Sequence, residues 1–150
     1  MASGKGNTNA AGLLQAIYQA VFTDLTTLLA NSASPGTTLY VSLHTANPGA
    51  AGAQNTSEAT YGGGTGYARV GVVRTNVGWT LTGETITNAS AITFGACVGG
   101  TGETETYIGI GTALSGAGTL LWFGALTASL AVSAGITPSI AAGALSITEA

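Results

Sequence analysis

Thr37-Thr-Leu-Tyr-Val-Ser-Leu-His-Thr45 alternates cleanly between apolar and polar side chains from Leu39 onward. In an extended chain Leu39, Val41 and Leu43 share one face, and the polar side chains between them share the other. Asn47-Pro48-Gly49 then stops the run. The segment predicts a β-strand and indicates a β fold for the chain that follows.

The same pattern of short β-forming runs separated by turn residues continues to the C-terminus. Further strands are predicted at 67–75, 79–82, 85–88, 91–97, 105–110, 120–126, 130–132 and 144–148. Gly83-Glu84 is typical of a turn, and hairpin turns are expected at 99–102 and 115–118. Many short strands with turns at this spacing favour an antiparallel β-sandwich or jelly-roll-like domain.

Upstream of the first strand, the spacing of apolar residues predicts one α-helix over residues 10–31. The stripe consists of Leu14, Tyr18, Val21, Phe22, Leu25, Leu28 and Leu29. Thr8 or Asn9 would cap it, and Pro35-Gly36 would end it. We expect this helix to cover a sheet of its own subunit, with packing against other copies as the alternative.

The sequence therefore predicts a mainly β single domain over 1–150 with one N-terminal α-helix. A flexible N-terminus is expected at 1–9, followed by the helix and then by a β domain at 37–150. Residues 47–66 within that domain are rich in Gly, Ala, Thr, Ser and Asn and predict a long loop. Loops of this length are usually functional or mobile.

Charge is scarce along the whole chain. Charged residues make up 6% of the 150 residues, whereas an ordinary domain has about 25%. Such a chain has few surface charges of either sign, and these charges are what keeps soluble proteins from associating. The composition therefore favours a subunit of a larger assembly. Lys5, Arg69 and Arg74 are the only permanent cations, too few for a nucleic-acid-binding surface.

The termini and apolar stretches predict neither a membrane span nor a secretion signal. The most apolar stretch, 120–136, is interrupted by Gly, Ser and Thr, and a transmembrane helix needs about 20 mainly apolar residues. Residues 1–9 lack the basic and apolar regions of a signal peptide. We expect no contact with a membrane.

The residues predict no enzyme, no catalytic residues, no metal site and no cofactor. His44 is the only histidine, and a catalytic triad would need it with Asp24 and a serine. The favoured interpretation is a strand-end His44 hydrogen-bonded to a neighbouring loop. Cys97, the only cysteine, is interpreted as a small buried hydrophobe beside Phe94 and Val98.

Two further sequence patterns are compared with those of catalytic and phosphate-binding sites. Glu103 and Glu105 alternate onto one face, which could suggest an acid/base pair, but a solvated or interface-facing hairpin edge is favoured. The glycine runs 62–66 and 109–111 lack the residues of a phosphate-binding or dinucleotide-binding loop. Both are interpreted as flexible backbone and tight turns.

The β portion resembles small virion proteins of tailed bacteriophages. The resemblance lies in Leu39-Tyr-Val-Ser-Leu-His-Thr45, Gly66-Tyr-Ala-Arg-Val70, Ile86-Thr-Asn-Ala-Ser-Ala-Ile-Thr-Phe94, Tyr107-Ile-Gly-Ile-Gly111, Gly118-Thr-Leu-Leu-Trp-Phe-Gly-Ala-Leu126, Gly135-Ile-Thr-Pro138 and Ala142-Gly-Ala-Leu-Ser-Ile147. Members of this group are labelled head decoration (cement) proteins or tail-fibre proteins. The resemblance implies a structural virion role and carries over no catalytic residue.

From these observations we expect a capsid decoration protein on the exterior of the virion, made in the cytoplasm of the host bacterium. It would bridge and stabilise capsomers of the major capsid protein, and it would associate with itself, as a homotrimer. The alternative is a tail or tail-fibre protein that contacts a host receptor or glycan. Broad, weak contacts repeated over many copies need no single strong site.

Overall fold

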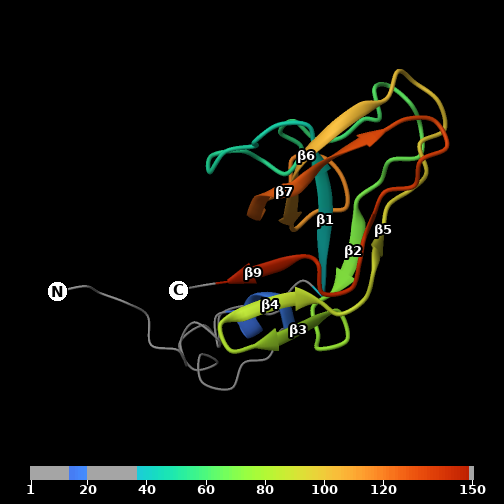
Figure 1. The fold of residues 1–150 in the computed structure, drawn as a ribbon. Coiled ribbons are helices and arrows are strands. Elements are labelled where there is room, and N and C mark those ends of the chain that lie inside the picture. The colour runs from blue at the N-terminus through green and yellow to red at the C-terminus, as the bar shows by residue number, and fades with distance from the viewer. Residues whose placement is uncertain (1–13, 20–36, 149–150) are drawn as a thin grey trace. The chain divides into compact units, whose positions relative to one another are not determined.

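The computed structural model describes residues 14–19 and 37–148 of the chain. Within them the elements are the π-helix η1 (Gln15–Gln19) and the strands β1 (Thr38–His44), β2 (Val70–Val73), β3 (Trp79–Thr82), β4 (Thr85–Asn88), β5 (Ile92–Thr93), β6 (Glu103–Gly111), β7 (Leu120–Val132), β8 (Ser139–Ile140) and β9 (Ser146–Thr148) (Figure 1). The chain is mainly β, as the sequence predicts. The packing of a sandwich or jelly roll stays a prediction.

Two compact units divide the chain. One consists of Met1–Thr38, Val73–Ile92 and Ile140–Ala150, and the other consists of Leu39–Val72 and Thr93–Ser139. Each is described by itself below. The prediction of a single domain stays a prediction.

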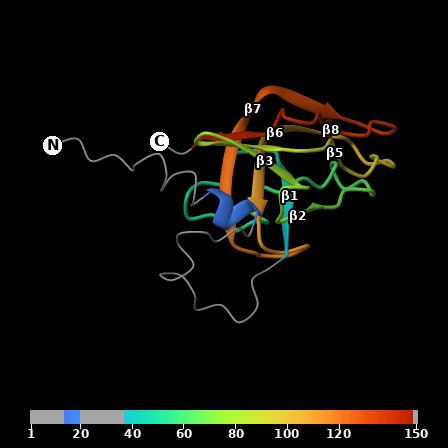
Figure 2. The same ribbon diagram turned by 90° about the horizontal axis from the view of Figure 1, so that it is seen from below.

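The larger unit is built on a four-stranded sheet with the order β2-β1-β6-β7. β1 and β6 are antiparallel, with Ser42 opposite Gly109, and β7 runs antiparallel to β6 on its other side (Figures 1 and 2). Leu39, Val41 and Leu43 of β1 are buried, which confirms the strand and the apolar face predicted for 37–45. The apolar side chains Ile108 and Ile110 of β6 are buried as well.

A second apolar cluster of this unit joins the long loop to the C-terminal end of β7. It consists of Tyr61, Cys97 and Val132, with Tyr67 and Leu130 packed against it. Cys97 is buried and unpaired, so its interpretation as a small core residue is confirmed. The rings of Tyr61 and Tyr67 meet edge to face with centroids 5.3 Å apart, an arrangement that aromatic pairs favour.

The smaller unit contains the sheet β3-β4-β9, in which both pairings are antiparallel. β3 and β4 match the predicted strands, and the two-residue loop Gly83-Glu84 joins them. Gly83 has a φ of +61°, which a tight hairpin turn requires at its first central position and which glycine adopts without steric cost. Trp79, Ile86 and Ile147 are buried in this unit.

The predicted N-terminal α-helix is not supported. Of residues 10–31 only 14–19 are described, and there Gln15–Gln19 forms a single turn of π-helix. The rest of the predicted helix, like the predicted flexible segment 1–9, lies outside the described residues. Tertiary contacts hold the turn: the Tyr18 ring meets the Trp79 ring at 4.8 Å, and Gln19 donates to the carbonyl of Trp79 at 2.6 Å. The spacing of apolar residues, on which the α-helix prediction rested, does not predict such tertiary contacts.

Other predicted elements change in length or pairing. The strand predicted at 91–97 shortens to β5, which pairs with β8, so the glycine-rich turn at 99–102 does not join two paired strands. The runs predicted at 120–126 and 130–132 are one strand, β7. The loop containing 115–118 does connect the paired strands β6 and β7, so that hairpin is confirmed. Among the described residues, no helix is long and apolar enough to span a membrane.

Candidate functional site

A buried ion pair, Arg69 with Glu58, is the strongest polar feature of the larger unit. Arg69 Nε and one terminal nitrogen each donate to a different carboxylate oxygen of Glu58, both at 2.6 Å. The Arg69 side chain is 1% exposed and that of Glu58 is 16% exposed. Two parallel charge-assisted hydrogen bonds in a buried place form a strong and geometrically specific pair.

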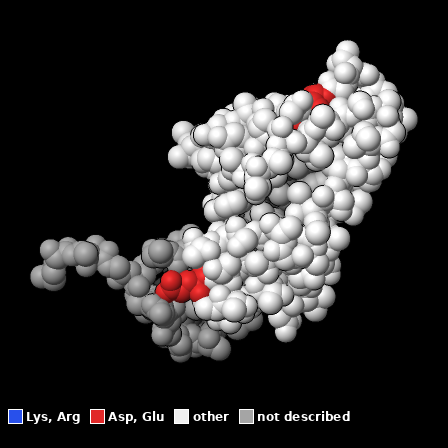
Figure 3. Space-filling model, in the orientation of Figure 1, with Lys and Arg blue, Asp and Glu red and all other residues white. Residues whose placement is uncertain are grey.

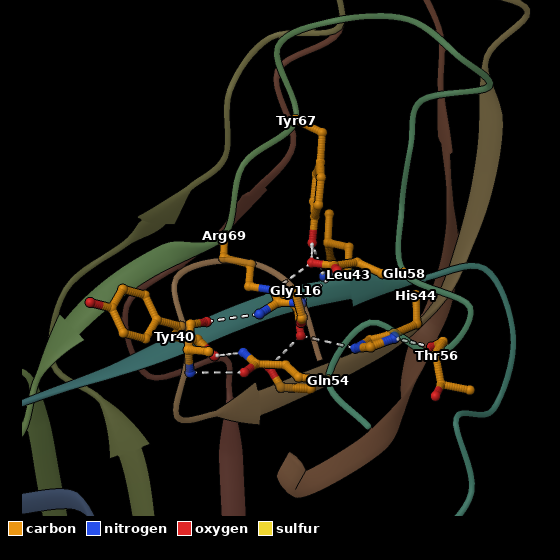
Figure 4. A network of polar contacts seen from close by, with 12 residues as sticks. Tyr40, Leu43, His44, Gln54, Thr56, Glu58, Tyr67, Arg69 and Gly116 are labelled. Atoms are coloured by element: carbon orange, nitrogen blue, oxygen red, sulfur yellow. Dashed lines mark hydrogen bonds and ion pairs between the residues drawn. The ribbon is translucent and has the colours of Figure 1, made fainter. Parts of the chain in front are cut away.

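The remaining donors of Arg69 reach the loop between β6 and β7. Its two terminal nitrogens donate to the carbonyls of Ala113 at 2.8 Å and Gly116 at 2.7 Å. One guanidinium therefore fixes both the loop that carries Glu58 and the β6–β7 hairpin loop. We call this arrangement, with the neighbours described below, the polar network (Figure 4).

Tyr67 extends the polar network to the central strand. Its hydroxyl donates to Glu58 at 3.0 Å and accepts the backbone N–H of Leu43 in β1 at 3.1 Å. Burial, and next the charge of Glu58, raise the pKa of Tyr67 well above its ordinary value. The hydroxyl therefore stays protonated and remains a donor to the carboxylate.

His44 forms the other end of the polar network. Its Nδ1 lies 2.8 Å from the Thr56 carbonyl, and its Nε2 lies 2.9 Å from the Ser42 hydroxyl. Because a carbonyl only accepts, Nδ1 carries the proton and Nε2 accepts from Ser42. Burial lowers the pKa of His44, so the ring is neutral at pH 7. The predicted strand-end histidine bonded to a loop is confirmed.

Ser42 and His44 have the elements of a nucleophile and a base, but the fold encloses both. Each side chain is 0% exposed. A carbonyl, that of Thr56, orients the ring in place of a carboxylate, and Asp24 lies outside the described residues. The contact therefore ties strand β1 to the long loop, because a hydroxyl without solvent access cannot meet a substrate.

Gln54 anchors the middle of the long loop. Its amide nitrogen donates to the Tyr40 carbonyl at 3.0 Å, and its amide oxygen accepts the N–H of Ala113 at 3.1 Å. The side chain is 0% exposed. It therefore links the long loop to β1 and to the β6–β7 loop, beside Arg69 in Figure 4.

Gly109 and Gly111 of β6 make room for these side chains. A Cβ on Gly109 would lie 2.6 Å from His44 Nε2, and one on Gly111 would lie 2.3 Å from the Gln54 side chain. Both glycines lie within strand β6, so their interpretation as flexible turns is wrong. The alternation in 107–111 places Ile108 and Ile110 in the core and leaves the opposite face open for the polar network.

We expect Gly109→Ala to destabilise the protein by about 1–3 kcal/mol, the usual cost of overpacking a filled interior. The added methyl group would displace the His44 ring. Chemical denaturation measures the loss. In the double variant Gly109→Ala with His44→Ala the two losses should be less than additive, because the obstructing ring is gone; full additivity would contradict the contact.

Glu103 and Glu105 occupy contrasting environments at the start of β6. The Glu103 carboxylate accepts the backbone N–H groups of Thr60 and Tyr61 and, at 3.1 Å, the Thr60 hydroxyl. These bonds, with one from the N–H of Gly62, outweigh burial and lower the pKa of Glu103. Positive φ angles at Tyr61 and Gly62 turn successive N–H groups toward the carboxylate.

Glu105 is enclosed in the domain. It is 0% exposed, and neither carboxylate oxygen has a hydrogen-bond partner with normal geometry. Burial, followed by the neighbouring Glu103, raises the pKa of Glu105 to about 8. Its interpretation as part of a solvated hairpin edge is wrong, because Glu105 lies opposite Leu130, which packs against the apolar cluster of Tyr61, Cys97 and Val132.

Sequence reasoning missed the pairing of Glu58 with Arg69, although both lie in or beside the predicted loop. One signal was available: in a chain with so few charges, two opposite ones lie eleven residues apart within 47–75. The glycine run 62–66 does form tight turns, with positive φ at Gly62, Gly63 and Gly66. Among the described residues, no group of three or more His, Cys, Asp or Glu is placed to hold a metal ion.

The geometry of the polar network by itself indicates a class of protein. In this low-charge, mainly β chain, the side chains of the polar network bind the loops of the larger unit to its sheet. Such internal bonding is typical of a structural subunit. The family of the podophage GP4 fiber I protein gp80 matches residues 13–148. The chain belongs to this family and is a structural protein of the phage virion. No curated protein matches it.

Proposed function

We propose that the protein is a structural subunit of the fibre of a podophage. The observation that carries this proposal is the family match over residues 13–148, whose description is that of a fibre protein. The fold is consistent with the role, because its loops are fixed to the sheet by buried polar bonds. A subunit of an external appendage needs such internal cross-links more than it needs a reactive site.

The surface supports a role in assembly. The face drawn in Figure 3 consists almost wholly of uncharged residues, with small areas of acidic atoms. Several large apolar side chains are exposed on the described part of the chain, among them Val77 (72%), Val98 (70%) and Leu114 (61%). Exposed apolar groups and scarce charge favour contact with other protein subunits.

A capsid decoration protein is the second candidate. The low charge and the resemblance to small head and tail proteins favour it. In that role the subunit would lie on the capsid exterior, bind the major capsid protein and stabilise the shell by mass action. In either role we propose that the subunit associates with itself, with a homotrimer as the expected state. Contact with a host receptor or glycan is proposed only for the role as a fibre protein.

Labelled antibody fragments on intact particles, viewed by electron microscopy, separate the candidates. Labels on the tail or its fibres are the expected result, and particles lacking the protein should lose adsorption to cells while keeping their heat resistance. Labels over the head, with genome release at lower temperature from depleted particles, would instead support the decoration role. Adding back purified protein is the control, since it should restore the lost property.

A further inference from the structure

β7 is an open edge of the sheet in the larger unit. The sheet order β2-β1-β6-β7 leaves one side of β7 without a neighbouring strand among the described residues. At its start, Ala53 of the long loop forms a bridge with Thr119, so the open edge begins at Leu120. In Figures 1 and 2 β7 runs beside β6. Its outward N–H and C=O groups are therefore available to another strand.

This edge lacks the usual chemical protection against pairing. Natural edge strands carry lysine, other charges, proline or bulges, or they are very short. β7 is 13 residues long and its sequence, LLWFGALTASLAV, contains neither charge nor proline. The chain has no charged residue at all between Glu105 and Glu149. Its bulges bend the strand, but Trp122–Ala125 keeps a regular register with β6.

The other edge of the same sheet is different. β2 has only four residues, and Arg69 and Arg74 flank it directly in sequence. Pairing β7 with the β2 of another copy would leave most of β7 uncovered, and such a head-to-tail contact would have to close into a ring or continue as a filament. A second β7 matches the first in length and in its absence of charge.

We propose that β7 of one subunit pairs antiparallel with β7 of a second copy about a two-fold axis. The two four-stranded sheets then become one continuous sheet, and exposed side chains of β7 such as Leu121 (44% exposed) lie beside those of the partner strand. A two-fold contact is closed and buries the same patch on both partners. If the subunit also forms trimers, this contact joins trimers in pairs. It does not depend on whether the protein lies in the fibre or on the head.

The first test places a like charge on the edge. Leu121→Lys and, separately, Ala125→Lys place an ammonium group on this edge. In the variant whose lysine lies nearer the axis the two copies of the ammonium group approach one another, so its apparent dissociation constant should rise about tenfold or more. Native mass spectrometry should show half the wild-type number of subunits. Asn76→Lys, at an exposed polar residue of the other unit, is the matched control and should leave the stoichiometry unchanged. Unchanged assemblies in both β7 variants, or a monomeric wild-type protein, overturn the proposal.

The second test maps the register. In a Cys97→Ala background, single cysteines are placed at the exposed positions Leu121, Ala125, Thr127, Ser129 and Ala131. Two-fold pairing predicts one maximum of self-disulfide formation along this series, with a decline on both sides, because only residues near the axis oppose themselves. Absence of any maximum, or efficient cross-linking only with a cysteine at Val73 of β2, overturns the proposal.

Discussion

Replacing Arg69 by methionine should lower the free energy of unfolding by about 3–5 kcal/mol, the usual cost of removing one partner of a buried ion pair. The substitution leaves the half-buried carboxylate of Glu58 with only the Tyr67 hydroxyl as a donor, and it leaves the carbonyls of Ala113 and Gly116 without the guanidinium. Since native domains are stable by about 5–15 kcal/mol, part of the protein should unfold. Denaturation by urea at fixed protein concentration measures the change.

Two variants show that the loss comes from the pairing. Arg69→Lys keeps the charge but loses the planar fork that meets both oxygens of Glu58, so it should fall between the wild type and Arg69→Met. The double variant Glu58→Met with Arg69→Met should lose less than the sum of the single losses. A cost below about 1 kcal/mol for Arg69→Met, the range of exposed pairs, would contradict the buried pair described here.

Stability should fall between pH 5 and pH 8 because of Glu105. The unfolded chain releases the Glu105 proton near pH 4.5, whereas the raised pKa of the native carboxyl keeps it protonated until about pH 8. Between these values the native state binds more protons than the unfolded state, so stability decreases as pH rises. Each pKa unit corresponds to about 1.4 kcal/mol, so Glu105→Gln, which cannot ionise, should be more stable than the wild type at pH 8 by about 2–4 kcal/mol.

Other groups titrate with the opposite sign, so the comparison is made between variants. The lowered pKa values of His44 and Glu103 add stability as pH rises toward about 6.5 for the histidine and toward about 4.5 for the carboxyl, and this gain is complete above those values. The difference between the wild type and Glu105→Gln isolates Glu105. Glu84→Gln, in the β3–β4 turn, is the matched control for the substitution itself. Parallel profiles for wild type and Glu105→Gln would show that Glu105 is ionised or solvated at pH 7.

The sequence determined the strands whose local signals agree with their tertiary surroundings. Alternation identified β1, and the two β-forming runs around Gly83-Glu84 identified the β3–β4 hairpin at its observed bounds. In both places the period of two and the turn chemistry act over a few residues. The scarcity of charge indicated a subunit of a larger assembly, and the resemblance of the β segments to small phage virion proteins implied a structural virion role before the family match.

Tertiary structure alone decided the polar network and the environments of the two glutamates. Arg69 meets Glu58 and the carbonyls of Ala113 and Gly116 because the β6–β7 loop returns to the long loop, and no local pattern encodes that return. Alternation correctly placed His44 opposite the apolar face of β1, but it predicts which face a side chain lies on and not whether a loop covers that face. Burial depends on contacts between residues distant in sequence, which is why Glu105, which looks like a surface residue in the sequence, is a protonated core residue in the fold.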